Sequence, residues 1–239
     1  MTTFTEDHPA FRVAAARRIL AREGCESRVA GHVSVRAPDR ADAMWVSPFG
    51  YFDETLPSHV IKTTLDLDLL EGDWEASPAV QFHADLYAAR PDVQSVVHTH
   101  SHWVEVYSCA ATDVGYYSAD SCLFHDEQVH YADDGISPPV HGPAMAAALG
   151  ADRTVCIAAN HGAVIVETTL ERATVKAIAL ETSCRAHVEA QLISGKEMPV
   201  AEIVRLKSAY EQYFIPMMWD ATYRRLRRSD PDLFAELDG

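Results

Sequence analysis

Apolar residues recur along this chain with two spacings, one typical of helices and one typical of short strands. Between residues 9 and 23 they follow the helical spacing, and Gly24 stands where such a helix would end. Similar stretches follow later in the chain, and Pro216 predicts a break in the last of them, because proline interrupts helical hydrogen bonding. The predicted helices are residues 9–23, 79–90, 141–149, 169–193 and 199–228.

Short runs of β-branched or bulky apolar residues lie between these helices. Turn-forming residues at 38–40 join the first two runs and predict a hairpin. Residues 47–50 (SPFG) predict a tight turn, because proline presets one backbone angle and glycine frees another. The predicted strands are residues 32–36, 43–46, 59–67, 95–98, 154–159 and 163–166.

Strands mixed with helices, without a repeat or a flexible linker, predict one α/β domain over residues 1–239. A hydrophobic content of 48% with 23% charged residues is that of a globular protein and excludes a disordered chain. The 35 acidic residues outnumber the 20 basic ones and give a formal net charge of −15. Such a chain repels polyanions, so we expect no nucleic-acid partner.

The cysteines and the apolar runs predict the cellular compartment of the protein. The five cysteines are odd in number and scattered, and they form no CxxC pair, which favours a reducing compartment over a disulfide framework. The first residues show neither the basic start nor the apolar run of a signal peptide, and no apolar stretch reaches membrane-spanning length. We therefore expect a cytoplasmic protein with no membrane partner.

Three histidines predict a metal site. His98 and His100 are two residues apart at the end of a predicted strand, so their side chains point to the same side. His161 lies in an NHG turn between two apolar strands, where it can supply a third ligand. A lone histidine is usually a hydrogen-bonded core or surface residue, but this set has a polar burial cost that a metal would offset. We expect one divalent ion per chain, with zinc first and manganese, cobalt or iron as alternatives.

The other histidines carry weaker signals. We interpret His83 and His102 as side chains that pack near the ligands or support them. For His125, His130 and His141 in a polar loop, solvent exposure is the simpler interpretation and substrate contact the alternative.

Several motifs together resemble the class II aldolase and adducin family, which includes fuculose-phosphate aldolase and ribulose-phosphate 4-epimerase. The resemblance extends from Gly31 to about Gln191 and is strongest in the HTHS and NHG motifs, in that order and spacing. The motifs that carry it are GHVSVR (31–36), SPFG (47–50), FHADLYAARPDVQSVVHTHS (82–101), ANHGAVIV (159–166) and TLERATVKAIALE (169–181).

The resemblance implies a three-layer α/β/α domain with a central, mainly antiparallel sheet flanked by helices. It also implies a ring-shaped homotetramer with the active site near a subunit interface. His98, His100 and His161 would be the metal ligands by this resemblance. The metal would chelate adjacent substrate oxygens and stabilise an enediolate or enolate as the bond to the neighbouring carbon breaks.

The chain departs from the sugar-phosphate aldolases at the start of one helix. Those enzymes have Ser-Ser-Glu there, with the glutamate as proton carrier, whereas this chain has Ser77, Pro78 and Ala79. Alanine carries no proton, and the loss of one serine weakens the expectation of a phosphate site. His32 also replaces the asparagine that normally follows the glycine of the first motif.

An intact metal triad without that glutamate predicts a metal-dependent carbon–carbon lyase acting on a small hydroxy-carboxylate. The principal reaction would be decarboxylation of a hydroxylated aromatic acid, and aldol-type cleavage is the nearer variant. One alternative is a non-haem iron oxygenase of a phenolic or hydroxy-acid substrate. A second alternative is a non-catalytic, adducin-like interaction protein, although such a protein would not need all three histidines.

The residues expected to handle the substrate follow from the same resemblance. A decarboxylation needs one proton delivered to the carbanion, from bound water, His32 or a tyrosine, for which Tyr131 is our candidate. Arg36 would favour a carboxylate group, and its alternative role is a structural ion pair. The predicted substrate-binding residues are Ser34, Arg36, Ser47, Gly50 and Ser77.

Overall fold

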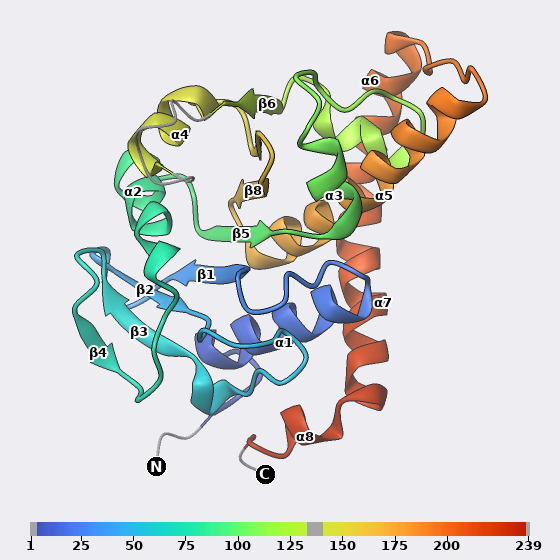
Figure 1. The fold of residues 1–239 in the computed structure, drawn as a ribbon. Helices are drawn as coiled ribbons and strands as arrows, with labels where there is room; N and C mark the ends of the chain where they lie inside the picture. Colours follow the sequence, from blue (N-terminus) through green and yellow to red (C-terminus); the bar gives the residue numbers. More distant parts are fainter. Residues whose placement is uncertain (1–3, 133–140, 238–239) are drawn as a thin grey trace.

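The computed structural model describes residues 4–132 and 141–237, and an eight-stranded sheet forms its centre (Figure 1). The strand order is β4-β3-β2-β1-β5-β8-β7-β6, and every neighbouring pair is antiparallel except β6 and β7. The strands are β1 (His32–Arg36), β2 (Ala43–Val46), β3 (Ile61–Thr64), β4 (Leu69–Glu71), β5 (Ser95–Thr99), β6 (Gln128–Tyr131), β7 (Val155–Ala158) and β8 (Gly162–Glu167).

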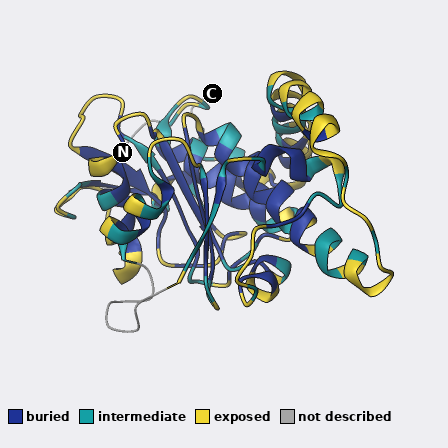
Figure 2. Ribbon diagram, turned by 90° about the horizontal axis from the view of Figure 1, so that it is seen from above, coloured by how far each residue is buried: buried dark blue, intermediate teal, exposed yellow. Residues whose placement is uncertain are grey.

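Helices cover both faces of the sheet, and buried strands run between them (Figure 2). The helices are α1 (Pro9–Arg22), α2 (Gln81–Ala89), α3 (His102–Tyr107), α4 (Gly142–Leu149), α5 (Leu170–Leu192), α6 (Val200–Ala209), α7 (Ile215–Ser229) and α8 (Pro231–Phe234). Short 3-10 turns span Pro57–His59, Pro78–Val80 and Ala119–Phe124, and a π-helical segment spans Tyr210–Phe214.

Alternate residues of the strands enter two separate cores. Val97 of β5 packs in the core that contains α1, α5 and the C-terminal helices, whereas Val96 packs in the core that contains α2 and α4. Because side chains two apart share a face of the sheet, His98 points to the same side as Val96. The α2 and α4 side is therefore the side on which a site built around His98 must lie.

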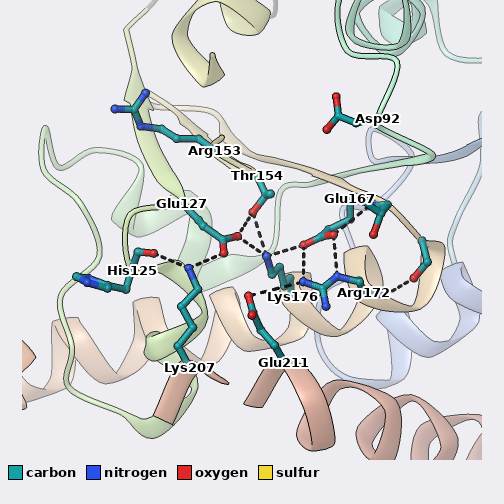
Figure 3. Close-up of polar contacts among 12 residues, drawn as sticks. Asp92, His125, Glu127, Arg153, Thr154, Glu167, Arg172, Lys176, Lys207 and Glu211 are labelled. Carbon is teal, nitrogen blue, oxygen red and sulfur yellow. Dashed lines mark hydrogen bonds and ion pairs between the residues drawn. The ribbon is translucent and has the colours of Figure 1, made fainter. Parts of the chain in front are cut away.

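A buried ion cluster joins α5 to the far end of the sheet (Figure 3). The Lys176 side chain on α5 is fully buried, and its Nζ lies 2.5 Å from a carboxylate oxygen of Glu127 and 2.5 Å from one of Glu167. Lys207 on α6 reaches Glu127 at 2.5 Å, and Arg172 reaches Glu167 at 2.9 Å. Because each buried charge has an opposite partner, the cluster holds α5, α6 and β8 against the turn before β6.

The predicted fold class is confirmed, as are the positions of all five predicted helices and all six predicted strands, within a few residues at their ends. The break expected at Pro216 is wrong, because helical structure continues from α6 through the π segment into α7. Pro216 lies in the first turn of α7, where the missing N–H interrupts no bond of that helix. The sequence analysis did not predict α3, α8, β4 or β6.

The C-terminal helices share a core with the first helix. Ile203, Ile215 and Leu226 belong to the same buried cluster as Phe11 of α1. That packing supports the single domain over residues 1–239, which stays a prediction. Within the described residues, no helix is long and apolar enough to cross a bilayer.

Candidate metal centre

The three predicted ligand histidines meet where β5 and β8 pair. His98 lies in β5 opposite Val164 of β8, and His100 follows the end of β5. The tight turn between β7 and β8 carries His161, and Asn160 before it adopts a left-handed conformation with a φ of 54°. Asparagine tolerates that conformation better than most residues, so the turn can close and direct His161 back toward β5.

Gly162 allows the turn to approach β5 this closely. A Cβ atom at this position would lie 2.9 Å from Cδ2 of His100 and closer still to the carbonyl oxygen of Thr99. Real Cβ atoms essentially never come within 3.0 Å of such neighbours. The glycine after His161 is therefore a steric requirement for bringing that histidine beside His100.

The ligand nitrogens converge on one point. Nε2 of His100 lies 2.8 Å from Nε2 of His98 and 3.2 Å from Nε2 of His161, and one nitrogen from each ring lies within 4.8 Å of the others. Nitrogens held about 2.0–2.1 Å from a tetrahedral zinc ion lie roughly 3.3 Å from one another. The spacing of the three rings thus fits a common divalent ion, which is what the sequence predicted.

The protonation state of the histidine rings also suits metal binding. Nδ1 of His98 lies 2.9 Å from the carbonyl oxygen of Ala163 and donates to it, which leaves the Nε2 lone pair free to bind a metal. Burial lowers the pKa of His98 well below its usual value and that of His100 to about 4. Both imidazoles are therefore neutral near pH 7, as metal ligation requires.

A cavity of about 460 Å³ opens above the triad. Apolar side chains from several segments form most of its wall: Ala30, Phe49, Pro78, Ala79, Phe82 and Pro143. The polar residues that line it, apart from the triad, are His32, Ser77, Gln81, Asp85 and His141. Among the described lining residues there is no lysine or arginine, so the cationic element of this site would be the metal itself.

His32 faces the cavity, and neither ring nitrogen has a partner among the residues that the structure describes. The side chain is 2% exposed, and both Nδ1 and Nε2 are buried without a hydrogen bond. Its ring centroid lies 5.4 Å from that of His98, with which it pairs across β1 and β5. Burial lowers its pKa well below the usual value, so a neutral ring offers one N–H donor and one acceptor to a bound molecule.

Ser34 lies behind this histidine rather than in the cavity. Its hydroxyl lies 2.7 Å from Nδ1 of His83 and 2.9 Å from the Tyr87 hydroxyl, and all three side chains are buried. This placement differs from the predicted substrate contact for Ser34, because the hydroxyl is already satisfied inside the core. It supports the interpretation of His83 as a side chain that packs near the ligands.

Arg36 lies at the opposite end of β1 from His32, and the structure corrects its predicted role. Its guanidinium donates to the carbonyl oxygens of Tyr87, Arg90, Val93 and Ala41. Its partners are carbonyls rather than carboxylates, and it is not among the described residues that line the cavity. Neither a substrate contact nor an ion pair describes it, because it ties β1 to the segment before β5.

The remaining predicted residues divide between cavity and scaffold. Ser77 lines the cavity and its hydroxyl accepts from the amide of Ala79, which begins a 3-10 turn. The Ser47 hydroxyl accepts from the Val33 amide and is buried, and the carbonyl of Gly50 accepts from Arg17. Tyr131 ends β6 and is not among the described lining residues.

The structure adds residues that the sequence analysis did not assign. Asp85 and Phe82 lie on the face of α2 that borders the cavity, and Phe49 borders it from the 47–50 turn. His141, for which substrate contact was the alternative interpretation, also lines it, while its Nδ1 accepts from the Ala144 amide at the start of α4. A helical spacing of three between positions 82 and 85 is the signal that could have suggested Asp85.

Other histidines are engaged away from the triad. The ring of His125 lies 2.9 Å from the Tyr116 hydroxyl, and that of His130 lies 3.3 Å from the Ser108 carbonyl. His102 is exposed at the start of α3 and packs edge-on against Trp103. These placements agree with non-ligand roles.

Comparison with known proteins agrees with this geometry. Residues 11–188 match the family described as class II aldolase and adducin N-terminal domain, so the chain belongs to the class II aldolase and adducin family. It is 31% identical over 202 residues to the 4-hydroxy-3-prenylphenylpyruvate oxygenase/4-hydroxy-3-prenylbenzoate synthase of Streptomyces roseochromogenus subsp. oscitans, covering 82% of this chain and 73% of that protein. Decarboxylase NovR of Streptomyces niveus is 30% identical over 204 residues, covering 82% and 74%.

A solved structure shares the fold over nearly the whole chain. L-fuculose 1-phosphate aldolase from Glaciozyma antarctica PI12 superposes with a TM-score of 0.82 at 26% identity, covering 93% of this chain and 90% of that one. The family and these relatives support an enzyme of the lyase type in general terms.

Proposed function

We propose that this protein is a metal-dependent carbon–carbon lyase that acts on a small hydroxy-carboxylate. Its principal reaction would be decarboxylation of a hydroxylated aromatic acid, with aldol-type cleavage as the variant. The observation that carries the proposal is a convergent histidine triad at the floor of an apolar cavity, with Ala79 where related aldolases have an acidic proton carrier. The similarity to a protein named as a decarboxylase supports the same reaction.

The chain's residues suit this chemistry in three ways. His98, His100 and His161 would hold the ion, which when bound supplies a Lewis acid for substrate oxygens. His32 would hold or deliver a proton at a ring nitrogen, since neither of its nitrogens has a hydrogen-bond partner within the described part of the chain. The apolar wall would exclude water from the carbanion until that proton arrives.

Metal content and turnover test the proposal directly. We expect protein purified without added metal to hold about one zinc or manganese ion per chain. It should release carbon dioxide from a member of a panel of hydroxy-aromatic acids without consuming oxygen. Release of an aldehyde instead would favour the aldol variant, and turnover that survives complete metal removal would refute the proposal.

Substitution of one ligand separates the site from the fold. His98→Ala removes a buried ligand and should abolish both metal binding and turnover, measured by elemental analysis and carbon dioxide release. His102→Ala is the matched control, because that histidine is exposed and only four residues away. Full activity in His98→Ala would contradict the assignment of the triad.

A second candidate function has one specific observation in its favour. The relative from Streptomyces roseochromogenus carries the name of an oxygenase at 31% identity. A non-haem iron oxygenase would also use three histidines and open coordination positions. Iron in the purified protein together with oxygen uptake on phenolic acids would favour this reaction over the lyase.

Assembly and location complete the proposal. We propose a homotetramer with the active site near a subunit interface, which the exposed Leu192 and Ile193 at the end of α5 support. Light scattering after gel filtration would measure the mass of the assembly.

We also propose a cytoplasmic location, supported by five cysteines that are all free.

A further inference from the structure

The turn at residues 47–50 contributes Phe49 to the wall of the cavity. Phe49 at its tip lines the cavity and also borders a neighbouring groove of about 330 Å³ that contains Trp74. The phenylalanine is 48% exposed although it borders an apolar space. Part of its ring is therefore available to a molecule bound in the cavity.

Two backbone amides, one in this turn and one directly after it, already have partners. The Phe49 amide donates to the carbonyl oxygen of Glu75 at 2.8 Å, and the Tyr51 amide donates to a carboxylate oxygen of Glu54 at 2.7 Å. A turn that binds a phosphate group does so through free amides that point at the anion. Here both donors are used within the protein.

The charged side chains that border the cavity and the neighbouring groove also oppose a phosphate. The Glu54 oxygen that accepts from Tyr51 would lie only 2.8 Å from a Cβ atom on Gly50, so a carboxylate lies against the turn itself. Asp73 and Glu75 border the neighbouring groove beside Phe49. A dianionic group in this region would meet carboxylates without a described lysine or arginine in the cavity wall to offset them.

A buried arginine holds the turn from behind. Arg17 on α1 is 0% exposed, and it donates to the carbonyl oxygens of Pro48 at 2.9 Å and Gly50 at 2.5 Å. Its guanidinium carbon lies 4.4 Å from the ring centroid of Phe52. These two bonds bracket Phe49, so the position of its ring depends on the arginine, whose donors face the turn.

We infer that Phe49 is a specificity-determining residue that contacts the aromatic or apolar part of the substrate, and that Arg17 is the positioning residue for Phe49. The 47–50 turn itself excludes phosphorylated substrates. The inference rests on the proposed function for one point, that the acid end of the substrate lies at the histidine triad. It narrows the substrate class to unphosphorylated hydroxy-acids with a ring or another bulky apolar group.

Two matched pairs of small acids test this by calorimetric titration of the zinc-loaded protein. Mandelate and lactate differ by a phenyl in place of a methyl group, and phosphoglycolate and glycolate differ by a phosphate. We expect mandelate to bind at least about tenfold more tightly than lactate, because the ring buries apolar surface. Phosphoglycolate should bind no more tightly than glycolate.

Variants assign these preferences to the turn. Phe49→Ala should reduce the preference for mandelate about three- to tenfold and leave lactate binding and zinc content unchanged. Phe49→Tyr keeps the ring and should retain the preference, and Tyr51→Ala is the control for an exposed aromatic outside the cavity. Arg17→Lys cannot make both guanidinium hydrogen bonds to the turn. It should therefore reduce the preference for mandelate over lactate, as Phe49→Ala does.

The outcomes separate this inference from the proposed function. Ring preference that depends on Phe49 supports the inference even if no acid is turned over. Equal binding of mandelate and lactate, an unchanged preference in Phe49→Ala, or phosphoglycolate binding about tenfold more tightly than glycolate would overturn it. In that case decarboxylation of another acid would leave the lyase proposal standing.

Discussion

The Gly162→Ala substitution tests whether the approach of the β7–β8 turn to β5 assembles the metal site. The new methyl group would overlap the Thr99 carbonyl and lie 2.9 Å from His100, so β8 must move away from β5. Overpacking of this kind costs about 1–3 kcal/mol. Replacing glycine regains about 0.4–1 kcal/mol by restricting the unfolded chain. We expect a net loss of roughly 1–2 kcal/mol, measured by urea unfolding.

The effect on the metal should exceed the effect on stability. Metal–ligand bonds tolerate displacements of only about 0.2 Å, and Gly162 lies between the ligand His161 and Ala163, whose carbonyl orients His98. Disturbing such a supporting contact weakens metal binding about 10- to 100-fold. Competition with a chromogenic chelator would measure zinc affinity in the folded variant.

A second glycine provides the control for this reasoning. Gly115→Ala also adds a methyl group, but its neighbours are the side chains of Glu197 and Tyr117, which can move. We expect wild-type zinc affinity in this variant. Wild-type affinity in Gly162→Ala as well would show that the glycine is not needed to place the ligands, and the steric argument would be refuted.

Three further predictions concern the scaffold. Lys176→Met leaves the buried carboxylate of Glu167 and the partly buried carboxylate of Glu127 without their shared cation, and should lower the free energy of unfolding by about 3–5 kcal/mol in urea melts. Arg185→Ala breaks an exposed ion pair and should cost under about 0.5 kcal/mol. Burial raises the pKa of Glu127, but Lys176 and the surrounding donors, Lys207 among them, outweigh it and hold the pKa at about 2. The contribution of Glu127 to stability is therefore complete above about pH 4.5 and should be lost as the pH falls toward 2; in acid titrations of Lys176→Met, where Lys207 remains, this loss should be smaller. Glu181→Ala removes the acceptor for the Trp103 and Val104 amides at the start of α3 and should cost about 1–2 kcal/mol in thermal melts, with Glu181→Gln intermediate.

Sequence reasoning recovered the elements whose hydrophobic pattern is self-contained. It found β5 because two valines stand directly before the predicted ligand His98, and all five residues of this strand are buried. It found α5 because a long apolar stripe follows its Thr169 cap. The meeting of the three histidines was predictable because they lie near strand ends next to turn residues, and their role as metal ligands stays a prediction. The steric role of Gly162 depends on the distance to another strand and could not be predicted.

Elements defined by distant contacts were missed. Helix α3 has only six residues, and its first turn is capped by Glu181 from α5 rather than by a neighbour in sequence. Strand β6 carries mixed polar residues and pairs in parallel with β7, which a local pattern does not reveal. Arg36 was assigned by its charge, although its hydrogen-bond acceptors in the fold are carbonyl groups.

The strand at one margin of the sheet also affects how the protein behaves at high concentration. β4 has three residues, and its pairing with β3 shifts register between Lys62 and Thr63. A short, irregular edge strand offers few aligned peptide groups to a second sheet, even though Leu69 and Leu70 are exposed there. Resistance to aggregation through this edge strand thus depends on irregular pairing rather than on a polar surface. A longer and regular β4 would make the sheet edge a template for fibril growth.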